Sequence, residues 1–574
     1  MQYWNANLFG LAKQWTPVMC SGLSLAGEPQ VPFASLTMLL SYLLGPSIGI
    51  MAGTYAYLAI GFLGAYLYSG LWLEDWRARL LAASLFIGNG FFICRISHGH
   101  LDFLPFLSLP LALWTVHETS DPTARLLTGA RRILAVLLLG CLFSMVVDGS
   151  PVAIIHLMFW IGVYAIGLGC VRKSVFPVLV FAAACCLASV LDAGYLWPML
   201  DAQTEFPRRM PDTFTGPWSL LWFMLIPMRG KVLPANGTGI ELSVYIGPFL
   251  AYLIWRFRHV VLARIPREVL LPTLLVSGVS IWLGMGSLHV AHVPVWLSPF
   301  DWLRPLPGFR SMNATGRYWC FLALPLSLLA TASVVHYAQL EPRPKHRNLL
   351  LLGTLLSQLL FQGESLASAW WPSVPHTDAA LHGLFDGTPR EIEMVVNPGT
   401  KAKPRHQGEF ISPVRGVVNC YDMDDFTRAP VTPGKSLIKA LRIDGDSRSP
   451  PAVLQAGFVT WNRIRIAAPP ASQAGGTLLH ITLNQAYHTG WSSPDCLLTR
   501  GEQDNLVATC PQSRVRSGAA ELTFFDPISD LGMRVSRWSA FALLSAALAL
   551  GLVILIPSRR AVVGTAPANA QRAR

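Results

Sequence analysis

Apolar runs long enough to cross a membrane recur along most of this sequence. A helix rises 1.5 Å per residue, so about 17–25 apolar residues are needed to cross the roughly 30 Å of hydrocarbon in a bilayer. About eleven such runs are centred near residues 48–73, 80–95, 101–117, 133–149, 152–170, 175–197, 242–256, 269–287, 318–337, 348–363 and 538–557. Hydrophobic residues make up 52% of the 574 residues and charged residues only 13%, which excludes an ordinary soluble enzyme. The sequence therefore predicts a polytopic α-helical membrane protein.

The net charge of +12 is explained by where the basic residues lie. Segments such as "TARLLTGARR", "WRFRHVVLARIPRE" and "EPRPKHRN" fall in every second gap between the apolar runs. This is the pattern of cytoplasmic loops under the positive-inside rule, so the charge does not indicate nucleic-acid binding. The intervening gaps, 198–241, 288–317 and 364–537, are then exoplasmic. We expect a multi-pass protein of a bacterial inner membrane.

The region 364–537 differs from the rest because apolar and polar residues alternate in it. In "FVTWNRIRIAA" Ile464 and Ile466 alternate with arginines, and "TLLHITLNQAY" repeats the pattern. This pattern predicts a β-rich domain, interpreted as a sandwich, held to the membrane by the last helix. The sequence thus divides into an exoplasmic loop (1–47), a helical body (48–363), a β-rich domain (364–537), a last spanning helix (538–557) and a cytoplasmic tail (558–574).

Three cysteines lie in this predicted exoplasmic domain, where the compartment favours disulfides. Cys496 and Cys510 flank a hairpin-like polar stretch, so we predict that they pair and leave Cys420 free. On sequence alone, Cys420 could equally well be a partner in the disulfide. The cysteines show no metal-ligand spacing.

Two histidines and an aspartate stand where an apolar run begins: His98, His100 and Asp102 in "CRISHGHLDF". Ionisable groups at or inside a membrane are costly unless they are paired or hydrated, so each is a functional candidate. On one α-helix, His98 and Asp102 would share a face, and the acid could orient the imidazole. The alternative is that Asp102 and His100 only cap the helix.

Arginines in the exoplasmic gap "LRPLPGFRSMNATGR" depart from the positive-inside pattern. Arg310 and Arg317 could bind a lipid phosphate through their guanidinium groups, or could simply extend to the membrane surface. Glu241 could act as a base, or it could be a carboxylate favoured by the N-terminus of a helix beginning near residue 242.

Four motifs together resemble the YfhO-type family of bacterial membrane proteins. They are "WTPVMCSGLSLAGEPQVPFASLTMLL", "ELSVYIGPFLAYLIW", "WLRPLPGFRSMNATGRYWCFLALPLSLLA", and "NQAYHTGW" with "AELTFFDPISDLGMRVS". That family is in turn similar to the C-type (GT-C) fold of glycosyltransferases that use polyprenyl-phosphate sugars. The resemblance implies a GT-C-like helical body, a lipid-linked sugar donor and an acceptor reached from the exoplasmic side.

The first exoplasmic loop departs from this resemblance. GT-C enzymes usually carry a catalytic acid there, whereas Glu28 is the only acid in this loop and the first aspartate is Asp75. We expect either that a first spanning helix is absent from this sequence or that one shorter run does not span. The first is favoured because residues 1–30 resemble the inside of the family's loop.

The function expected is transfer of a sugar from a polyprenyl-phosphate donor to a cell-surface glycan or lipid. The alternative is a non-catalytic transporter, flippase or assembly factor for surface polymers. The expected partners are the lipid donor and membrane lipid, and no nucleic acid. The sequence assigns no cofactor and leaves a divalent cation open. Glu28, His98, His100, Asp102 and Glu241 are the candidate catalytic residues. We expect Asp102 to lie within roughly 10–12 Å of Arg310 or Arg317.

Overall fold

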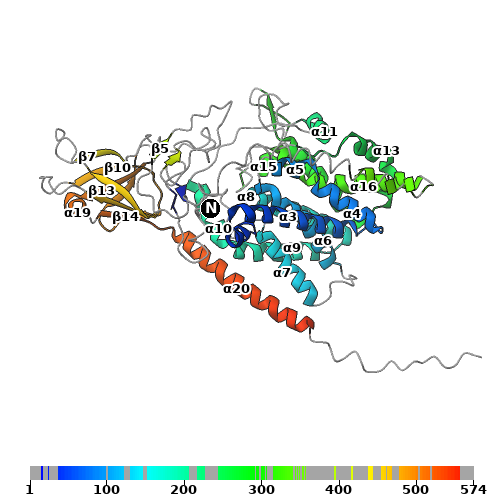
Figure 1. The fold of residues 1–574 in the computed structure, drawn as a ribbon, viewed down its shortest axis with the longest axis horizontal. Helices are drawn as coiled ribbons and strands as arrows, with labels where there is room; N and C mark the ends of the chain where they lie inside the picture. The colour runs from blue at the N-terminus through cyan, green and yellow to red at the C-terminus, as the bar shows by residue number, and fades with distance from the viewer. Residues whose placement is uncertain are drawn as a thin grey trace, which may run out of the picture.

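The computed structural model is mostly helical, with a β-containing region near the C-terminus (Figure 1). It describes residues 15–16, 23–24, 36–97, 101–121, 130–145, 151–205, 216–225, 243–290, 293–296, 299–303, 305–306, 315–340, short pieces between 343 and 356, 393–395, 415–417, 437–443, 454–460, 462–467, 478–501, 505–517 and 520–555.

The helical body contains α-helices and two 3-10 helices, here called η. In chain order these are α2 (Leu36–Leu44), α3 (Pro46–Ser69), α4 (Trp76–Ile87), α5 (Gly90–Ser97), η1 (Leu101–Ser108), α6 (Leu109–Thr119), α7 (Ala130–Met145), α8 (Pro151–Arg172), α9 (Phe176–Leu191), α10 (Ala193–Glu205), α11 (Pro217–Leu225), α13 (Pro248–Arg264), α14 (Arg267–Met285), α15 (Pro299–Leu303), η2 (Thr315–Leu322) and α16 (Ala323–Leu340). Short strand pairs, β1 (Trp15–Thr16) with β2 (Leu23–Ser24) and β3 (Leu288–Val290) with β4 (Val293–Trp296), accompany them.

Within the described residues, three continuous helical segments are long and apolar enough to cross a membrane. They are Ile48–Ser69, Arg267–Met285 and Thr315–Leu340, and two bent helix pairs raise the number to five. These findings support a membrane protein, while the expected set of about eleven spans remains a prediction.

Two of the expected spans are bent rather than straight. The run 80–95 forms α4 and α5, which meet at an angle of 47°, and the run 175–197 forms α9 and α10, bent by 81°. At the first break, the Asn89 side chain accepts a hydrogen bond from the Phe91 amide and so caps α5. A broken helix leaves backbone groups that must be satisfied inside the protein.

The expected span 242–256 begins later in the structure. α13 starts at Pro248, after Gly247, whose φ of 87° lies in the left-handed region that favours glycine. Proline favours the first position of a helix, which explains this start. Residues 243–247 precede α13 without helical structure. The predicted helix start near residue 242 was therefore wrong by about one and a half turns.

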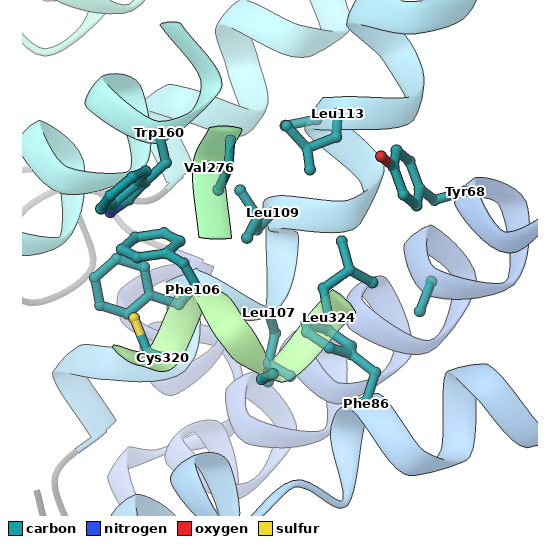
Figure 2. Close-up of a cluster of buried hydrophobic side chains, with 14 of the residues drawn as sticks. Tyr68, Phe86, Phe106, Leu107, Leu109, Leu113, Trp160, Val276, Cys320 and Leu324 are labelled. Carbon is teal, nitrogen blue, oxygen red and sulfur yellow. The ribbon is translucent and has the colours of Figure 1, made fainter. Parts of the chain in front are cut away.

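Side chains from most of these helices meet in one apolar core (Figure 2). Phe106, Leu107 and Leu109 lie at the centre, between Trp160 on one side and Phe86 and Leu324 on another. Glycines on α3 let this central segment approach closely, because a Cβ at Gly64 would lie only 2.5 Å from the Leu111 amide nitrogen. Small residues at helix contacts are typical of membrane bundles.

The C-terminal region contains a β-sandwich, as predicted. One sheet has the order β12–β13–β10–β7 and the other β11–β14–β9–β8. Their bounds are β7 (Ile438–Ile443), β8 (Gln455–Thr460), β9 (Arg463–Ala467), β10 (Leu478–Ala486), β11 (Trp491–Ser492), β12 (Leu497–Arg500), β13 (Asn505–Pro511) and β14 (Ala520–Phe524), and two short parallel strands, β5 (Glu393–Val395) and β6 (Arg415–Val417), precede them. Ile464, Ile466, Leu479, Ile481 and Leu483 are buried in one core that both sheets share, which confirms the expected alternation.

The predicted disulfide between Cys496 and Cys510 is present. Cys496 directly precedes β12 and Cys510 lies on the antiparallel neighbour β13, so their Cα atoms are 4.3 Å apart. Cys420 lies outside the described residues.

The last helix, α20 (Pro527–Leu555), starts 11 residues before the expected boundary at 538. Its first turns pack against α10, where the Gly194 amide donates to the Ser536 hydroxyl over 2.9 Å. Gly532 lies against the same turn, since a Cβ there would be 2.5 Å from the Ala193 oxygen. Further along, Trp538 and Phe541 are exposed. Figure 1 shows α20 running from the sandwich along the helical body.

Replacing both cysteines of this disulfide with serine should destabilise the sandwich. The bond closes a loop with a sequence separation of 14 residues, which corresponds to about 3 kcal/mol in the chain-entropy account. Limited proteolysis of the full chain should cut the double variant within the sandwich faster than the wild type. Equal rates, or the absence of a linked 496–510 peptide in non-reducing mass spectrometry, would contradict the assignment.

Candidate functional site

The helical body has two ends that polar side chains mark, called here the Phe103 end and the Arg172 end. α3, α6 and α8 terminate at the Arg172 end and α14 starts there, because Tyr68, His117, Arg172 and Glu268 are joined by hydrogen bonds. η1 and η2 start at the Phe103 end, which is also where α8 begins. In the helical body, α3, α6 and α8 therefore run toward the Arg172 end and α14 runs away from it.

Two arginines lie on one aromatic ring at the Phe103 end. The Arg317 guanidinium carbon is 5.3 Å from the Phe103 ring centroid, and that of Arg95 is 3.9 Å from the same centroid. Arg95 also lies 5.3 Å from the Phe91 ring and is fully buried. Cation–π contacts contribute about 0.5–2 kcal/mol, which offsets only part of the cost of burying a charge. The two guanidinium groups are therefore brought together on one ring inside the helical body.

Asp102 directly precedes Phe103 in η1. The predicted segment of Asp102 and the predicted Arg317 are thus brought to the same end. Asp102 lies in a 3-10 helix that starts at Leu101, whereas His98 lies outside the described residues, so the sharing of one helix face by His98 and Asp102 stays a prediction. His98, His100 and the side chain of Asp102 lie outside the described part, so their distance to the arginines remains a prediction.

A histidine and a tyrosine extend this polar group into the core. His156 Nε2 and the Tyr318 hydroxyl are 3.1 Å apart, and their rings are 4.7 Å apart. Tyr318 follows Arg317 directly, and both aromatic residues are buried. Trp160, one turn after His156, has a buried indole N–H that finds no acceptor among the described residues. The Trp160 indole lies beside Tyr318, with ring centroids 6.2 Å apart.

The segment after Glu241 also lies next to this site. The Gly90 amide donates to the Tyr245 oxygen over 3.2 Å, and a Cβ at Gly90 would be 2.6 Å from the Ser243 hydroxyl. The Ser243 side chain also lies beside Cys94, the neighbour of Arg95. The alternative role of Glu241 as a carboxylate at a helix N-terminus finds no support, because α13 starts at Pro248.

The remaining predicted site residues, Glu28, Arg310 and Glu241 itself, lie outside the described residues. Among the residues that the structure describes, no group of three or more His, Cys, Asp or Glu side chains could hold a metal ion. A divalent cation therefore stays unassigned.

A second polar group closes the Arg172 end. Arg172 donates from Nε to Glu268 over 2.7 Å and from Nη1 to the His117 oxygen and the Ser120 hydroxyl, each over 2.9 Å. Its Nη2 lies 3.0 Å from His117 Nε2. These bonds join α6, α8 and α14 through a single side chain.

The hydrogen bonds around His117 determine its tautomer. A guanidinium can only donate, so Nε2 of His117 accepts from Arg172 and its proton resides on Nδ1. Nδ1 then donates to the Tyr164 hydroxyl, 3.1 Å away. Tyr68 donates to Tyr164 over 3.3 Å and is 2.9 Å from the Thr273 hydroxyl. The chain of polar contacts thus runs from α8 through α6 to α3 and back to α14.

Arg95, His156 and the Arg172 network were missed in the sequence. Arg95 and His156 are single polar residues inside runs that were treated as apolar. Their position could have identified them, because an ionisable residue within a membrane span usually has a function or a polar partner. Arg172 was counted only as part of a basic gap.

A scan of known protein families finds no match to this chain, and a search of curated proteins finds no similar sequence.

Replacing Arg172 with glutamine should lower the free energy of unfolding by about 3 kcal/mol, because the change leaves His117 Nε2 and other buried acceptors without their donor. Arg465→Gln is the matched control, since Arg465 makes a similar 2.6 Å bond to Glu521 on the exposed sandwich surface. An exposed pair contributes about 1 kcal/mol or less. Thermal unfolding of both purified variants in detergent tests this. Equal unfolding midpoints of the two variants would contradict the stabilising role of Arg172.

Proposed function

We propose that this protein is a membrane glycosyltransferase of GT-C type that uses a polyprenyl-phosphate sugar donor. The observation that carries the proposal is the convergence of Arg95 and Arg317 on Phe103, the residue next to Asp102. An arginine guanidinium group can donate two parallel hydrogen bonds to phosphate oxygens. Burial lowers the local dielectric constant and so strengthens the electrostatic attraction between the two groups. The resemblance of the sequence to the YfhO-type family is in agreement with this proposal.

The reaction follows from these roles. The acceptor hydroxyl attacks the anomeric carbon of the donor sugar, and the bond between that carbon and the phosphate oxygen breaks. The leaving phosphate takes the electron pair, and Arg317 and Arg95 neutralise its charge. Asp102, assisted by His98 or His100, accepts the proton of the acceptor hydroxyl. No redox partner or further reagent is needed.

The sandwich lies at the same end of the helical body as Arg95 and Arg317, which is the Phe103 end. α9 leaves the Arg172 end at Phe176 and reaches α10, which packs against the first turns of α20, directly after strand β14. In the proposed topology the Phe103 end and the sandwich are both exoplasmic. A domain beside the site could hold a surface glycan or lipid as acceptor.

The second candidate is a non-catalytic transporter or flippase for the same class of lipid. The α4–α5 break supports it, because the extended residues 243–247 pack directly on the break. Discontinuous helices beside irregular buried backbone are a common way to build a transport site.

The arginine site predicts phosphate-dependent binding of polyprenyl lipids. Farnesyl phosphate should bind the purified full chain, whereas farnesol should bind at least about tenfold more weakly, a difference of about 1.4 kcal/mol. Arg317→Gln should remove this difference and Arg317→Lys should retain part of it, because lysine keeps the charge without the fork. Arg442→Gln, on the sandwich, is the control and should bind as the wild type does.

Transfer from radiolabelled polyprenyl-phosphate hexoses in membranes separates the two candidates. Product that disappears with Asp102→Asn, while farnesyl phosphate binding persists, supports the transferase. If farnesyl phosphate binds but none of the donor sugars yields a transfer product, the result favours the transporter or flippase. Equal binding of farnesol and farnesyl phosphate would refute both.

Topology provides another test. A reporter that is active only in the cytoplasm should be active when fused after Arg560, and silent when inserted in the sandwich. Activity in the sandwich would place the Phe103 end in the cytoplasm and contradict the proposed acceptor side.

A further inference from the structure

The exposed surface of α13 changes from aromatic to basic halfway along the helix. Tyr252 and Trp255 are 55% and 63% exposed, and their ring centroids are 6.2 Å apart. The next turn exposes Arg256 and Arg258. The Arg258 side chain folds back onto Trp255, donating to its oxygen over 2.5 Å and placing its guanidinium carbon 5.4 Å from the indole ring.

This change occurs level with the end of a neighbouring long helix. Phe257 lies 5.0 Å from the His336 ring and 6.2 Å from the Tyr337 ring, in the last turns of α16. The segment Thr315–Leu340, which ends with α16, is long and apolar enough to span a membrane. The Tyr252–Trp255 pair therefore lies where aromatic residues gather at the boundary of a bilayer, and the arginines lie at the headgroup level.

Four exposed arginines form this surface, called here the α13 corner: Arg256, Arg258, Arg264 and Arg267. Within the described part of the chain none of them makes an ion pair. The adjacent Glu268 is engaged by Arg172, and Arg264 only approaches the Gln339 side chain, at 3.5 Å. The corner thus presents positive charge that no carboxylate among the described residues neutralises.

We propose that the α13 corner binds the phosphate of anionic glycerophospholipids in the leaflet at the Arg172 end. Each basic residue near an anionic membrane surface contributes about 1 kcal/mol, and arginine forks match phosphate oxygens. The aromatic pair contacts the glycerol and upper acyl region of the same lipid. An acidic soluble protein would match the arginines but not the aromatic residues that continue the same helix face. This inference does not depend on the proposed transferase activity.

The location gives lipid binding a consequence for the site. α13 starts at Pro248, directly after residues 243–247, which pack against the α4–α5 break beside Cys94 and Arg95. A lipid that holds α13 also holds this buried segment in place.

The test uses the full chain in a neutral detergent, titrated with phosphatidylglycerol or phosphatidylcholine of the same acyl chains. Phosphatidylglycerol should raise the unfolding midpoint and remain bound in native mass spectrometry, and phosphatidylcholine should do neither. A variant with all four corner arginines changed to glutamine should bind phosphatidylglycerol at least about tenfold more weakly. A control with Arg442, Arg463, Arg465 and Arg514 of the sandwich changed to glutamine alters the net charge equally and should bind as the wild type does.

Three outcomes would overturn the proposal. One is equal stabilisation of the wild type by the two lipids, which needs no variant and so remains decisive if the quadruple variant does not fold. Another is an equal loss in the sandwich control, which would show a general charge effect. The last is full competition by inorganic phosphate or polyglutamate at the ionic strength of the assay, which would show that the surface binds anions without a lipid requirement.

Discussion

Polar groups buried within an apolar bundle must find partners inside the protein, and α8 shows how this chain meets that demand. His156, Trp160, Tyr164 and Arg172 all lie on its buried face, spaced by four or eight residues. His156 meets Tyr318 at one end and Arg172 meets His117 and Glu268 at the other. The two ends of the body thus carry paired polar groups, and the middle, seen in Figure 2, is mainly apolar. Helix direction, packing and the position of the site all depend on this one helix.

Features set by local patterning could be predicted from the sequence. Alternation at Ile464 and Ile466 predicted a half-buried strand, and the position of Cys496 and Cys510 around one hairpin favoured their pairing, although Cys420 remained open as a partner on sequence alone. The apolar content specified a helical membrane body. These properties depend on neighbouring residues along the chain, so no knowledge of distant contacts was needed.

Features set by tertiary contact could not be predicted. Hydropathy placed a helix start near residue 242, but residues 243–247 instead pack as extended chain on Gly90, which is distant in the sequence. Hydropathy likewise cannot show that Asp102 lies in a 3-10 helix or that Arg95 meets Phe103. The arrangement of Arg317 near the Asp102 segment was predicted from charge alone, because ionisable groups at one membrane face tend to share a site. Their partner Arg95 was missed because a single charge hardly alters the hydropathy of a run.

The contact between Gly194 and Gly532 has a consequence for how this protein can diversify. It joins α10 and α20 backbone to backbone, so the sandwich is mounted on the helical body through a rigid support rather than a loose tether. Loops of the sandwich can then change in length or composition without disturbing the buried arginines, because no part of the support passes through them. A chain built in this way lets the loops of the sandwich and the helical body change independently, so each part can evolve under its own pressure.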